Sequence, residues 1–356
     1  MHQDRRRRAV ANEQAGDGTW TRTGTGAGTL ASGRDPRALP KAELHLHLLA
    51  AMRPATLAEL ASDAGHAAPD PRGFADFEGF QQVYAAAFDA TSDRPANLRR
   101  VVTELVEDTA ADGGVWVQPH FDPRSYAHFG APEDVLDLVL DAGRQAGARR
   151  GVGFGLTLAV SRHATPAAAV RLARFAARYA GRGVHALGLT GHEGARGTGE
   201  FAEAFAIART AGLTSAPHAG ELRGPDSVRA AVDRLGATRV AHGIRAVEDP
   251  ALLELLAARG VSLDVCLTSN RVLGLVPDLA RHPLPRLLAA GVRCSLGTDD
   301  PLMFGASLSD EYRTARTALG LTDHQLAEIA RASLETSDAP PELIAAATEG
   351  VDAWLG

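Results

Sequence analysis

The chain has 356 residues and a formal net charge of -6 at pH 7, and 45% of its residues are hydrophobic against 22% charged. This composition is typical of a globular α/β enzyme and argues against disorder of the main body. Because the acidic balance offers no basic surface for phosphate backbones, we predict a small-molecule partner and no nucleic acid.

The N-terminal segment differs from the rest of the chain. Residues 1–36 carry the arginine run Arg5 to Arg8 and many Gly, Thr and Ser residues, but lack the apolar stretch of a signal peptide. We interpret them as a disordered leader, or as upstream sequence added by a misplaced start codon, and residues 37–356 as a single catalytic domain. No apolar run approaches the roughly 20 residues that span a bilayer, so we predict no membrane partner.

Two rare residue types narrow the chemistry. Cys266 and Cys294 are the only cysteines and each lies in an apolar run, which favours reduced thiols and a cytoplasmic location. Lys41 is the only lysine, and it precedes the first predicted strand rather than ending one. This position argues against a Schiff base or a carbamylated lysine that bridges two metals. The oligomeric state stays open.

From about residue 40 onward, short apolar runs alternate with longer segments of helical period. This is the pattern of successive βα units on a parallel sheet, and eight such units predict a (β/α)8 TIM barrel. The predicted strands are 42–48, 115–121, 152–160, 185–190, 213–218, 239–243, 261–268 and 293–298.

The connection after the first strand is longer than one helix requires. We predict helices at 54–64, 77–90 and 95–111, an insertion that would lie over the mouth of the barrel as a lid. Thr165-Pro166 and Asp249-Pro250 are typical helix starts, and residues 308–355 are helical by period. The last segment is expected to complete the outer ring with extra C-terminal helices.

Several strand ends carry groups that can bind a metal. Strand alternation would place His45 and His47 on one face, although a His-x-His triplet alone is a weak signal. His218 adds a third nitrogen and Asp299 an oxygen, a mixed set that suits one zinc ion per chain, with iron or manganese still open. The alternative for Asp299 is a cap of the following turn.

Three further residues are candidates for proton transfer or charge stabilisation. Glu221 is placed to exchange a proton with a substrate, unless it is a solvent-facing loop residue. His242 could stabilise charge at the attacked centre or be a satisfied core histidine. Asp300 would hydrogen-bond water or substrate.

The motifs PKAELHLHL, PHAGEL, RVAHGIR, CLTSN and GTDDP occur in this order, and together they resemble the adenosine deaminase family over residues 38–340. The resemblance implies hydrolysis of adenosine, or of a close 6-aminopurine nucleoside, to the 6-oxo product and ammonia. It implies zinc bound by His45, His47, His218 and Asp299. It also implies that Glu221 is the proton shuttle to purine N1 and that His242 and Asp300 lie beside the reacting water. Asp300 would in addition contact N7, and the Gly191 amide would contact N3.

One departure from the family pattern concerns the substrate. Leu49 and Ala50 stand where the family usually has an acid and a glycine, and in adenosine enzymes that acid holds the ribose 5′-hydroxyl. The sequence therefore leaves a second interpretation open, a 6-aminodeoxyfutalosine deaminase, to which the segment Ala51 to Pro54 is similar. In that case Arg53 or Arg124 would pair with the substrate carboxylate, although either could be a solvated surface arginine. His120 receives no role.

Three other classes of protein fit the sequence less well. A cytidine-type deaminase needs Pro-Cys-x-x-Cys, and neither cysteine has such a neighbour. A two-metal amidohydrolase usually needs the bridging lysine that is absent from the strand ends. An inactive nucleoside-binding protein is the remaining alternative, and the complete set of candidate ligands with Glu221 argues against it.

Overall fold

The computed structural model describes residues 33–65, 67–68, 70–74 and 77–356. Residues Arg34–Gly356 form one compact unit. Residues 1–32 of the predicted leader lie outside the described residues, so the leader stays a prediction. Asp35 accepts a hydrogen bond from the Trp354 indole N–H at 2.9 Å through its backbone carbonyl.

All eight predicted strand runs contain strands, and two runs are each split into two strands. The bounds are β1 Lys41–Glu43, β2 Gly114–Val117, β3 His120–Phe121, β4 Gly153–Phe154, β5 Leu156–Ser161, β6 Val184–Thr190, β7 Thr214–Ala219, β8 Arg239–His242, β9 Ser262–Val265 and β10 Arg293–Leu296. The second predicted strand breaks before His120 because Pro119 has no N–H with which to continue the ladder.

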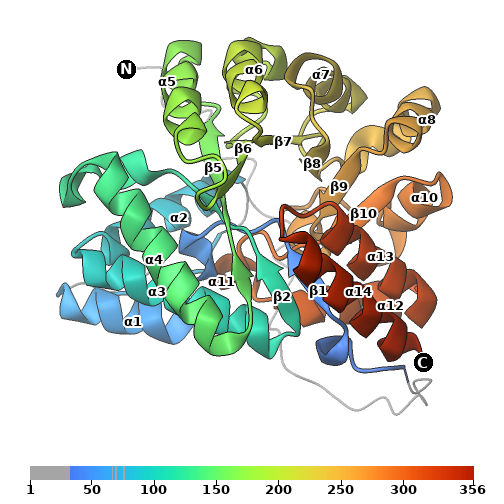
Figure 1. Ribbon diagram of the computed structural model, residues 1–356, viewed down its shortest axis with the longest axis horizontal. Coiled ribbons are helices and arrows are strands. Elements are labelled where there is room, and N and C mark those ends of the chain that lie inside the picture. Colours follow the sequence, from blue (N-terminus) through green and yellow to red (C-terminus); the bar gives the residue numbers. More distant parts are fainter. Residues whose placement is uncertain (1–32, 66, 69, 75–76) are drawn as a thin grey trace, which may run out of the picture. The chain divides into compact units, whose positions relative to one another are not determined.

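The strands form two parallel ladders that together make a barrel. One ladder has the order β1-β2-β4 and the other β10-β9-β8-β7-β6-β5-β3, and every strand pair in them is parallel. Because β2 continues into β3 and β4 into β5 within single runs, the ladders join at that side. Figure 1 shows the strands at the centre, with α4 to α8 outside them.

The first and last strands meet through the backbone of candidate site residues. His47 N donates to Asp299 O at 2.8 Å, and Asp299 N donates to His45 O at 2.8 Å. Gly297 permits this approach, because a Cβ there would lie 2.7 Å from His45 Cβ. The seam closes the ring, which confirms the predicted (β/α)8 barrel and brings three candidate ligands to one point of its rim.

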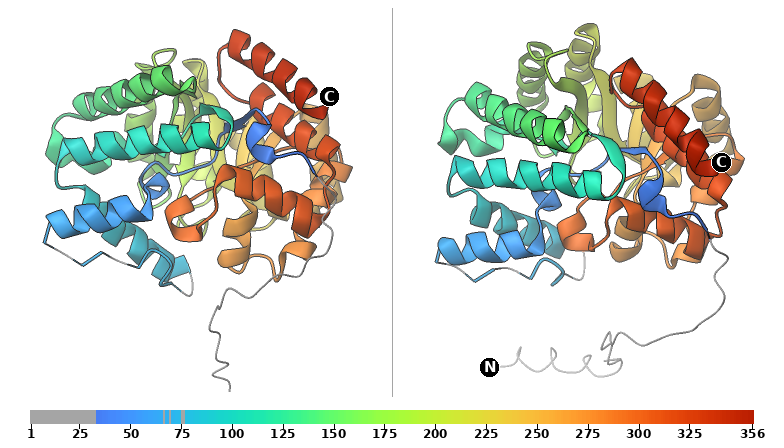
Figure 2. Two further views of the ribbon diagram at one scale, coloured as in Figure 1. Left: turned by 90° about the horizontal axis from the view of Figure 1, so that it is seen from below. Right: turned by 60° about the horizontal axis from the view of Figure 1, so that its bottom comes forward.

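The insertion after β1 contains the three predicted helices, α1 Pro54–Asp63, α2 Phe77–Thr91 and α3 Pro95–Ala111. In both views of Figure 2 these helices, blue to cyan, lie across the barrel from the red C-terminal helices. The C-terminal helices are α12 Leu308–Leu319, α13 Asp323–Glu335 and α14 Pro341–Leu355, as predicted.

The other helices follow individual strands, and their starts confirm two sequence signals. Thr165 accepts a hydrogen bond from Ala168 N, and Asp249 from Ala251 N, as helix caps do. The bounds are α4 Pro132–Arg150, α5 Pro166–Ala177, α6 Ala202–Thr210, α7 Pro225–Leu235, α8 Pro250–Arg259, α9 Leu267–Val272, α10 Leu284–Ala289 and α11 Pro301–Phe304. The short 3₁₀ turns are Pro36–Ala38, Leu49–Ala51, Pro123–Phe129, Thr198–Phe201, Ile244–Glu248 and Leu279–Arg281. Within the described part of the chain, no helix is long and apolar enough to cross a membrane.

Lys41 opens β1 instead of preceding it, and its ammonium group is fully buried. The ammonium donates to the carbonyls of Pro36 and Leu39 at 2.8 and 2.9 Å, and also to that of Asp112. Burial lowers the pKa of Lys41 to about 8. Since Lys41 is the first residue of its strand, it lies at the end of the barrel opposite the carboxyl ends of the strands. Cys266 and Cys294 are free buried thiols, as predicted.

Candidate active site

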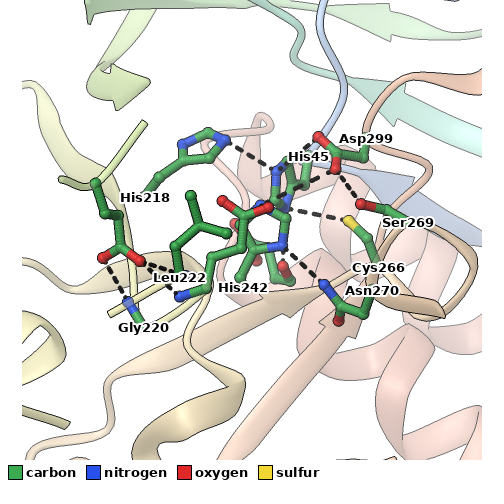
Figure 3. Close-up of polar contacts among 12 residues, drawn as sticks. His45, His218, Gly220, Leu222, His242, Cys266, Ser269, Asn270 and Asp299 are labelled. Carbon is green, nitrogen blue, oxygen red and sulfur yellow. Dashed lines mark hydrogen bonds and ion pairs between the residues drawn. The ribbon is translucent and has the colours of Figure 1, made fainter. Parts of the chain in front are cut away.

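Four predicted metal ligands come together at the carboxyl ends of the strands. His45 and His47 follow β1, His218 lies in β7 and Asp299 follows β10, and one ligand atom from each lies within 4.8 Å of the others. Figure 3 shows His45, His218 and Asp299 close together.

The distances among these atoms match a single coordination sphere. His45 Nε2 lies 3.2 Å from His218 Nε2 and 3.5 Å from Asp299 Oδ1, and His47 Nε2 lies 3.4 Å from Asp299 Oδ1. Ligand atoms about 2.0–2.2 Å from one zinc ion are themselves about 3.0–3.6 Å apart. The residues therefore fit a divalent ion at their centre.

Neighbouring groups orient two of these ligands. His45 Nδ1 lies 2.8 Å from the Asp264 carbonyl oxygen, which can only accept, so Nδ1 carries the proton and Nε2 offers its lone pair. Ser269 Oγ donates to Asp299 Oδ2 at 2.5 Å, which leaves Oδ1 directed at the imidazoles. Burial, and then the neighbouring imidazole of His45, hold the pKa of His218 well below its usual value, so this ring stays in the neutral form that binds metals.

A second group of possible ligands overlaps the first and consists of His45, His242, Cys266 and Asp299. Cys266 Sγ lies 3.3 Å from His45 Nδ1, the nitrogen that is already protonated toward Asp264. Burial raises the pKa of the Cys266 thiol well above its usual value, whereas a metal binds the thiolate. The set with His47 and His218 is therefore the better metal site.

Glu221 and His242 face each other beside this set. Glu221 follows β7 and is buried, and its Oε1 lies 3.7 Å from His242 Nε2. Burial raises the pKa of Glu221 well above its usual value, and the charge of Asp299 raises it further. A raised pKa favours the protonated carboxyl, which is the form that can donate a proton as a shuttle.

Asn270 and His282, to which sequence analysis assigned no role, hold His242 in one orientation. Asn270 Nδ2 lies 3.4 Å from His242 Nδ1, and Asn270 Oδ1 lies 3.1 Å from His282 Nε2. If the amide donates to Nδ1, the proton of His242 is on Nε2, which faces Glu221 and Asp299. Burial, followed by the charge on His45, lowers the pKa of His242 to about 3, so the ring is neutral.

The backbone is strained at two of these positions. Among the described residues, His242 and Asp299 are the only non-glycine residues with positive φ, at 64° and 59°. Such conformations cost of order 1–3 kcal/mol each and persist where the surrounding structure fixes them. His242 ends β8 and Asp299 lies three residues after β10, and their side chains approach to 4.0 Å, between His242 Nε2 and Asp299 Oδ2.

Glu193 anchors the loop that carries Glu221. Its Oε2 accepts hydrogen bonds from the backbone N–H groups of Glu221, Leu222 and Arg223 at 3.0, 2.6 and 2.8 Å. Its Oε1 accepts from Gly220 N at 2.9 Å and from Ser227 Oγ at 2.6 Å. Sequence reasoning missed this residue, although Glu193 lies two positions after Gly191, which it had named.

Arg162 was also missed. Its guanidinium is buried and donates to the His218 carbonyl at 2.7 Å and to Thr198 Oγ1 at 3.1 Å. Arg162 directly follows β5, so a side chain from the end of β5 fixes the backbone of the candidate ligand His218 in β7.

A cavity of about 350 Å³ is lined by His47, His218, Glu221, His242 and Asp299. Its walls include Gly191, with φ 89°, and Asp300, whose buried Oδ1 has no hydrogen-bond partner among the described residues. Phe80, Gln81 and Tyr84 of α2 also line it, so the insertion does cover the site, whereas its motion stays a prediction. We refer to this space as the catalytic cavity.

The two arginines considered for a substrate carboxylate are already paired. Arg53 contacts Asp108 at 2.6 Å and Glu107 at 3.3 Å, and Arg124 contacts Asp122 at 2.7 Å. Neither lines the catalytic cavity. His120 is buried and forms a backbone bridge with His47.

Comparison with known proteins agrees with this geometry. A family model described as Adenosine deaminase matches residues 40–354. A putative adenosine/adenine deaminase of Streptomyces coelicolor is 44% identical over 338 residues, which cover 90% of this chain and 98% of the relative.

Two further proteins bear on substrate and metal. An aminodeoxyfutalosine deaminase of Acidothermus cellulolyticus is 35% identical over 294 residues, 78% of this chain and 82% of the relative. A crystal structure of an amidohydrolase from Burkholderia ambifaria with bound zinc is 26% identical with a TM-score of 0.79, covering 90% of this chain and 92% of that one.

Proposed function

Because the chain belongs to the adenosine deaminase family, whose members are metal-dependent hydrolases of amidine C–N bonds, we propose that it deaminates adenosine or a close 6-aminopurine nucleoside. The products are the 6-oxo nucleoside and ammonia. The observation that carries the proposal is the set of four ligand atoms within 4.8 Å of one another, with the carboxyl group of Glu221 beside them.

We propose one zinc ion per chain, held by His45, His47, His218 and Asp299. The mixed nitrogen and oxygen donors suit zinc, and a structural relative contains it. When bound, the ion would lower the pKa of a coordinated water to about 7. His45 is suited to this role because its Nδ1 faces the Asp264 carbonyl and leaves Nε2 toward the ion, and His218 because burial lowers its pKa.

The chain's other residues bind the purine and move protons. Glu221, whose pKa is raised by burial, would give its proton to purine N1. His242 and Asp300 line the catalytic cavity beside the ligands, where they would orient the attacking water, and Asp300 would also bind N7. The Gly191 amide would bind N3, and the α2 residues would exclude bulk water.

Aminodeoxyfutalosine is the second candidate substrate, favoured by the Acidothermus relative. Its benzoate would need a cation near the site. Since Arg53 and Arg124 both pair with the chain's own carboxylates, we consider aminodeoxyfutalosine a weaker candidate substrate than an uncharged nucleoside.

An ammonia-release assay tests the proposal. The panel contains adenosine, 2′-deoxyadenosine, adenine, 5′-substituted adenosines and aminodeoxyfutalosine. We expect at least one uncharged nucleoside to be deaminated with a kcat/KM in the range typical of enzymes, about 10⁴–10⁸ M⁻¹s⁻¹. A zinc-loaded chain that binds nucleosides but releases no ammonia from any of them would instead be an inactive binding protein.

A further inference from the structure

A line of buried polar side chains connects the start of α10 with the catalytic cavity. Its members are His282, Asn270 and His242, which are 3%, 0% and 1% exposed. His282 Nε2 lies 3.1 Å from Asn270 Oδ1, and Asn270 Nδ2 lies 3.4 Å from His242 Nδ1, a contact that Figure 3 shows. His242 lines the catalytic cavity, whereas Asn270 and His282 are not among the described residues that line it.

A backbone amide locates the proton of His282. Leu284 N lies 3.1 Å from His282 Nδ1, and a backbone N–H can only donate, so this nitrogen accepts and carries no proton. Burial lowers the pKa of His282 to about 4, so the ring is neutral near neutral pH and keeps one proton. That proton is therefore on Nε2, which faces the side-chain oxygen of Asn270.

The Asn270 amide passes this direction on to His242. Its Oδ1 accepts from His282 Nε2, and its NH₂ group, which can only donate, faces His242 Nδ1. The opposite amide orientation would set the NH₂ group against the His282 N–H, two buried donors without an acceptor. The backbone of Asn270 is fixed too, because its N–H donates to Cys266 O at 3.0 Å and its carbonyl accepts from Leu275 N at 2.9 Å.

His242 accordingly carries its proton on Nε2. This nitrogen lies 3.7 Å from Glu221 Oε1 and 4.0 Å from Asp299 Oδ2, and both of these residues line the catalytic cavity. With this tautomer, the ring can donate a hydrogen bond at the reacting centre and so stabilise negative charge on an attacking oxygen. With the proton on Nδ1, Nε2 would present a lone pair to two carboxyl groups and could stabilise no such charge.

We propose that His282 is a positioning residue that sets the tautomer of His242 through the Asn270 amide. For its effect on rate, this inference rests on the proposed function, to which it adds a residue outside the catalytic cavity. The direction of the hydrogen bonds follows from the protein's own donors and acceptors and does not depend on which purine is bound.

Two substitutions separate the two hydrogen bonds of His282. His282→Gln places an amide N–H near the position of Nε2 and keeps the donor to Asn270, whereas His282→Asn places an oxygen near Nδ1 and keeps the acceptor for Leu284. We expect His282→Asn to lower kcat by about 10- to 100-fold at nearly constant KM, less than the roughly 10⁴-fold loss when a catalytic histidine is held in the wrong tautomer. His282→Gln should keep most of the wild-type kcat.

These rates are measured as ammonia release from the most rapidly deaminated nucleoside of the panel. His324→Asn, the same change at an exposed position of α13, is the control and should leave kcat unchanged. Equal kcat in the two His282 variants, or a lower kcat in His282→Gln, would overturn the proposal, because a residue that only caps α10 needs the acceptor that Asn retains.

Nitrogen-15 NMR of the zinc-loaded, histidine-labelled chain reads the tautomers without turnover. The signals of His242 and His282 are assigned by their loss in His242→Gln and His282→Gln protein. We expect both wild-type rings to carry the proton on Nε2, and His242 to shift toward the Nδ1–H form in His282→Asn. If that variant does not fold, the wild-type tautomers still decide the question.

A wild-type proton on Nδ1 of either ring would overturn the proposal, as would an unchanged His242 signal in folded His282→Asn protein. The expected tautomers in a chain that releases no ammonia would overturn the proposed function and leave the role of His282 supported.

Discussion

Replacement of Glu221 by Gln is expected to lower kcat for deamination by about 10²–10⁴-fold, the usual contribution of a positioned general acid or base. Gln has nearly the same shape but cannot carry a proton between the attacking water and the purine ring. Because Glu221 is not one of the four presumed ligands, the variant should keep its metal. Ammonia release gives kcat, and elemental analysis gives the metal content.

The control for this variant is Glu203→Gln, the same chemical change at an exposed position of α6. It should leave both kcat and metal content unchanged. If Glu221→Gln retained wild-type kcat, the proton shuttle would have to be another group. If it lost the metal, Glu221 would belong to the coordination sphere, and its role would need to be reassigned.

Replacement of Glu193 by Ala is expected to lower kcat by about 10²-fold, although Glu193 does not line the catalytic cavity. The reason is that a displacement of about 1 Å at a reacting group can lower the rate by this factor. The variant leaves four backbone N–H groups and the Ser227 hydroxyl without their acceptor. Each buried unpaired donor costs about 1–3 kcal/mol, so the loop that carries Glu221 should change conformation.

Two matched variants separate positioning by Glu193 from a general loss of stability. Glu193→Gln keeps one acceptor oxygen and should have an intermediate kcat, while Ser227→Ala removes a single donor and should lower kcat by less than about 10-fold. The expected signature is a fall in kcat at nearly constant KM and constant metal content. A lower melting temperature with unchanged kcat would mean that Glu193 is structural only.

The barrel and the convergence of the four candidate ligands could be predicted from sequence because their signals are local. Each strand is a short apolar run, and parallel strands bring their carboxyl ends to one edge, so His218 and Asp299 were expected beside His45. The prediction was less accurate for the residues at which each strand begins and ends within its apolar run. β1 ends at Glu43, so His45 and His47 reach the site from an extended segment outside the regular strand, where His47 pairs with His120.

The groups that support the site could not be predicted in the same way. Glu193 bonds to residues 27 to 34 positions away, and Ser269 to Asp299 across 30 positions. Arg162 bonds to His218 across 56 positions. Such contacts depend on how separate loops pack, and no periodicity or spacing records that packing. Ser269 lies in the motif CLTSN and Glu193 lies two positions after Gly191, yet nothing in either segment specifies what a hydroxyl or carboxylate contacts.

The central claim is that one divalent ion is bound by the imidazoles of His45, His47 and His218 and by the carboxylate of Asp299. Anomalous diffraction at the zinc edge from crystals of the purified chain tests it most directly. We predict one peak per chain, about 2.0–2.3 Å from three imidazole nitrogens and one Asp299 oxygen. A fully active chain without such a peak, or a peak coordinated by Cys266 and His242 instead, would contradict the claim.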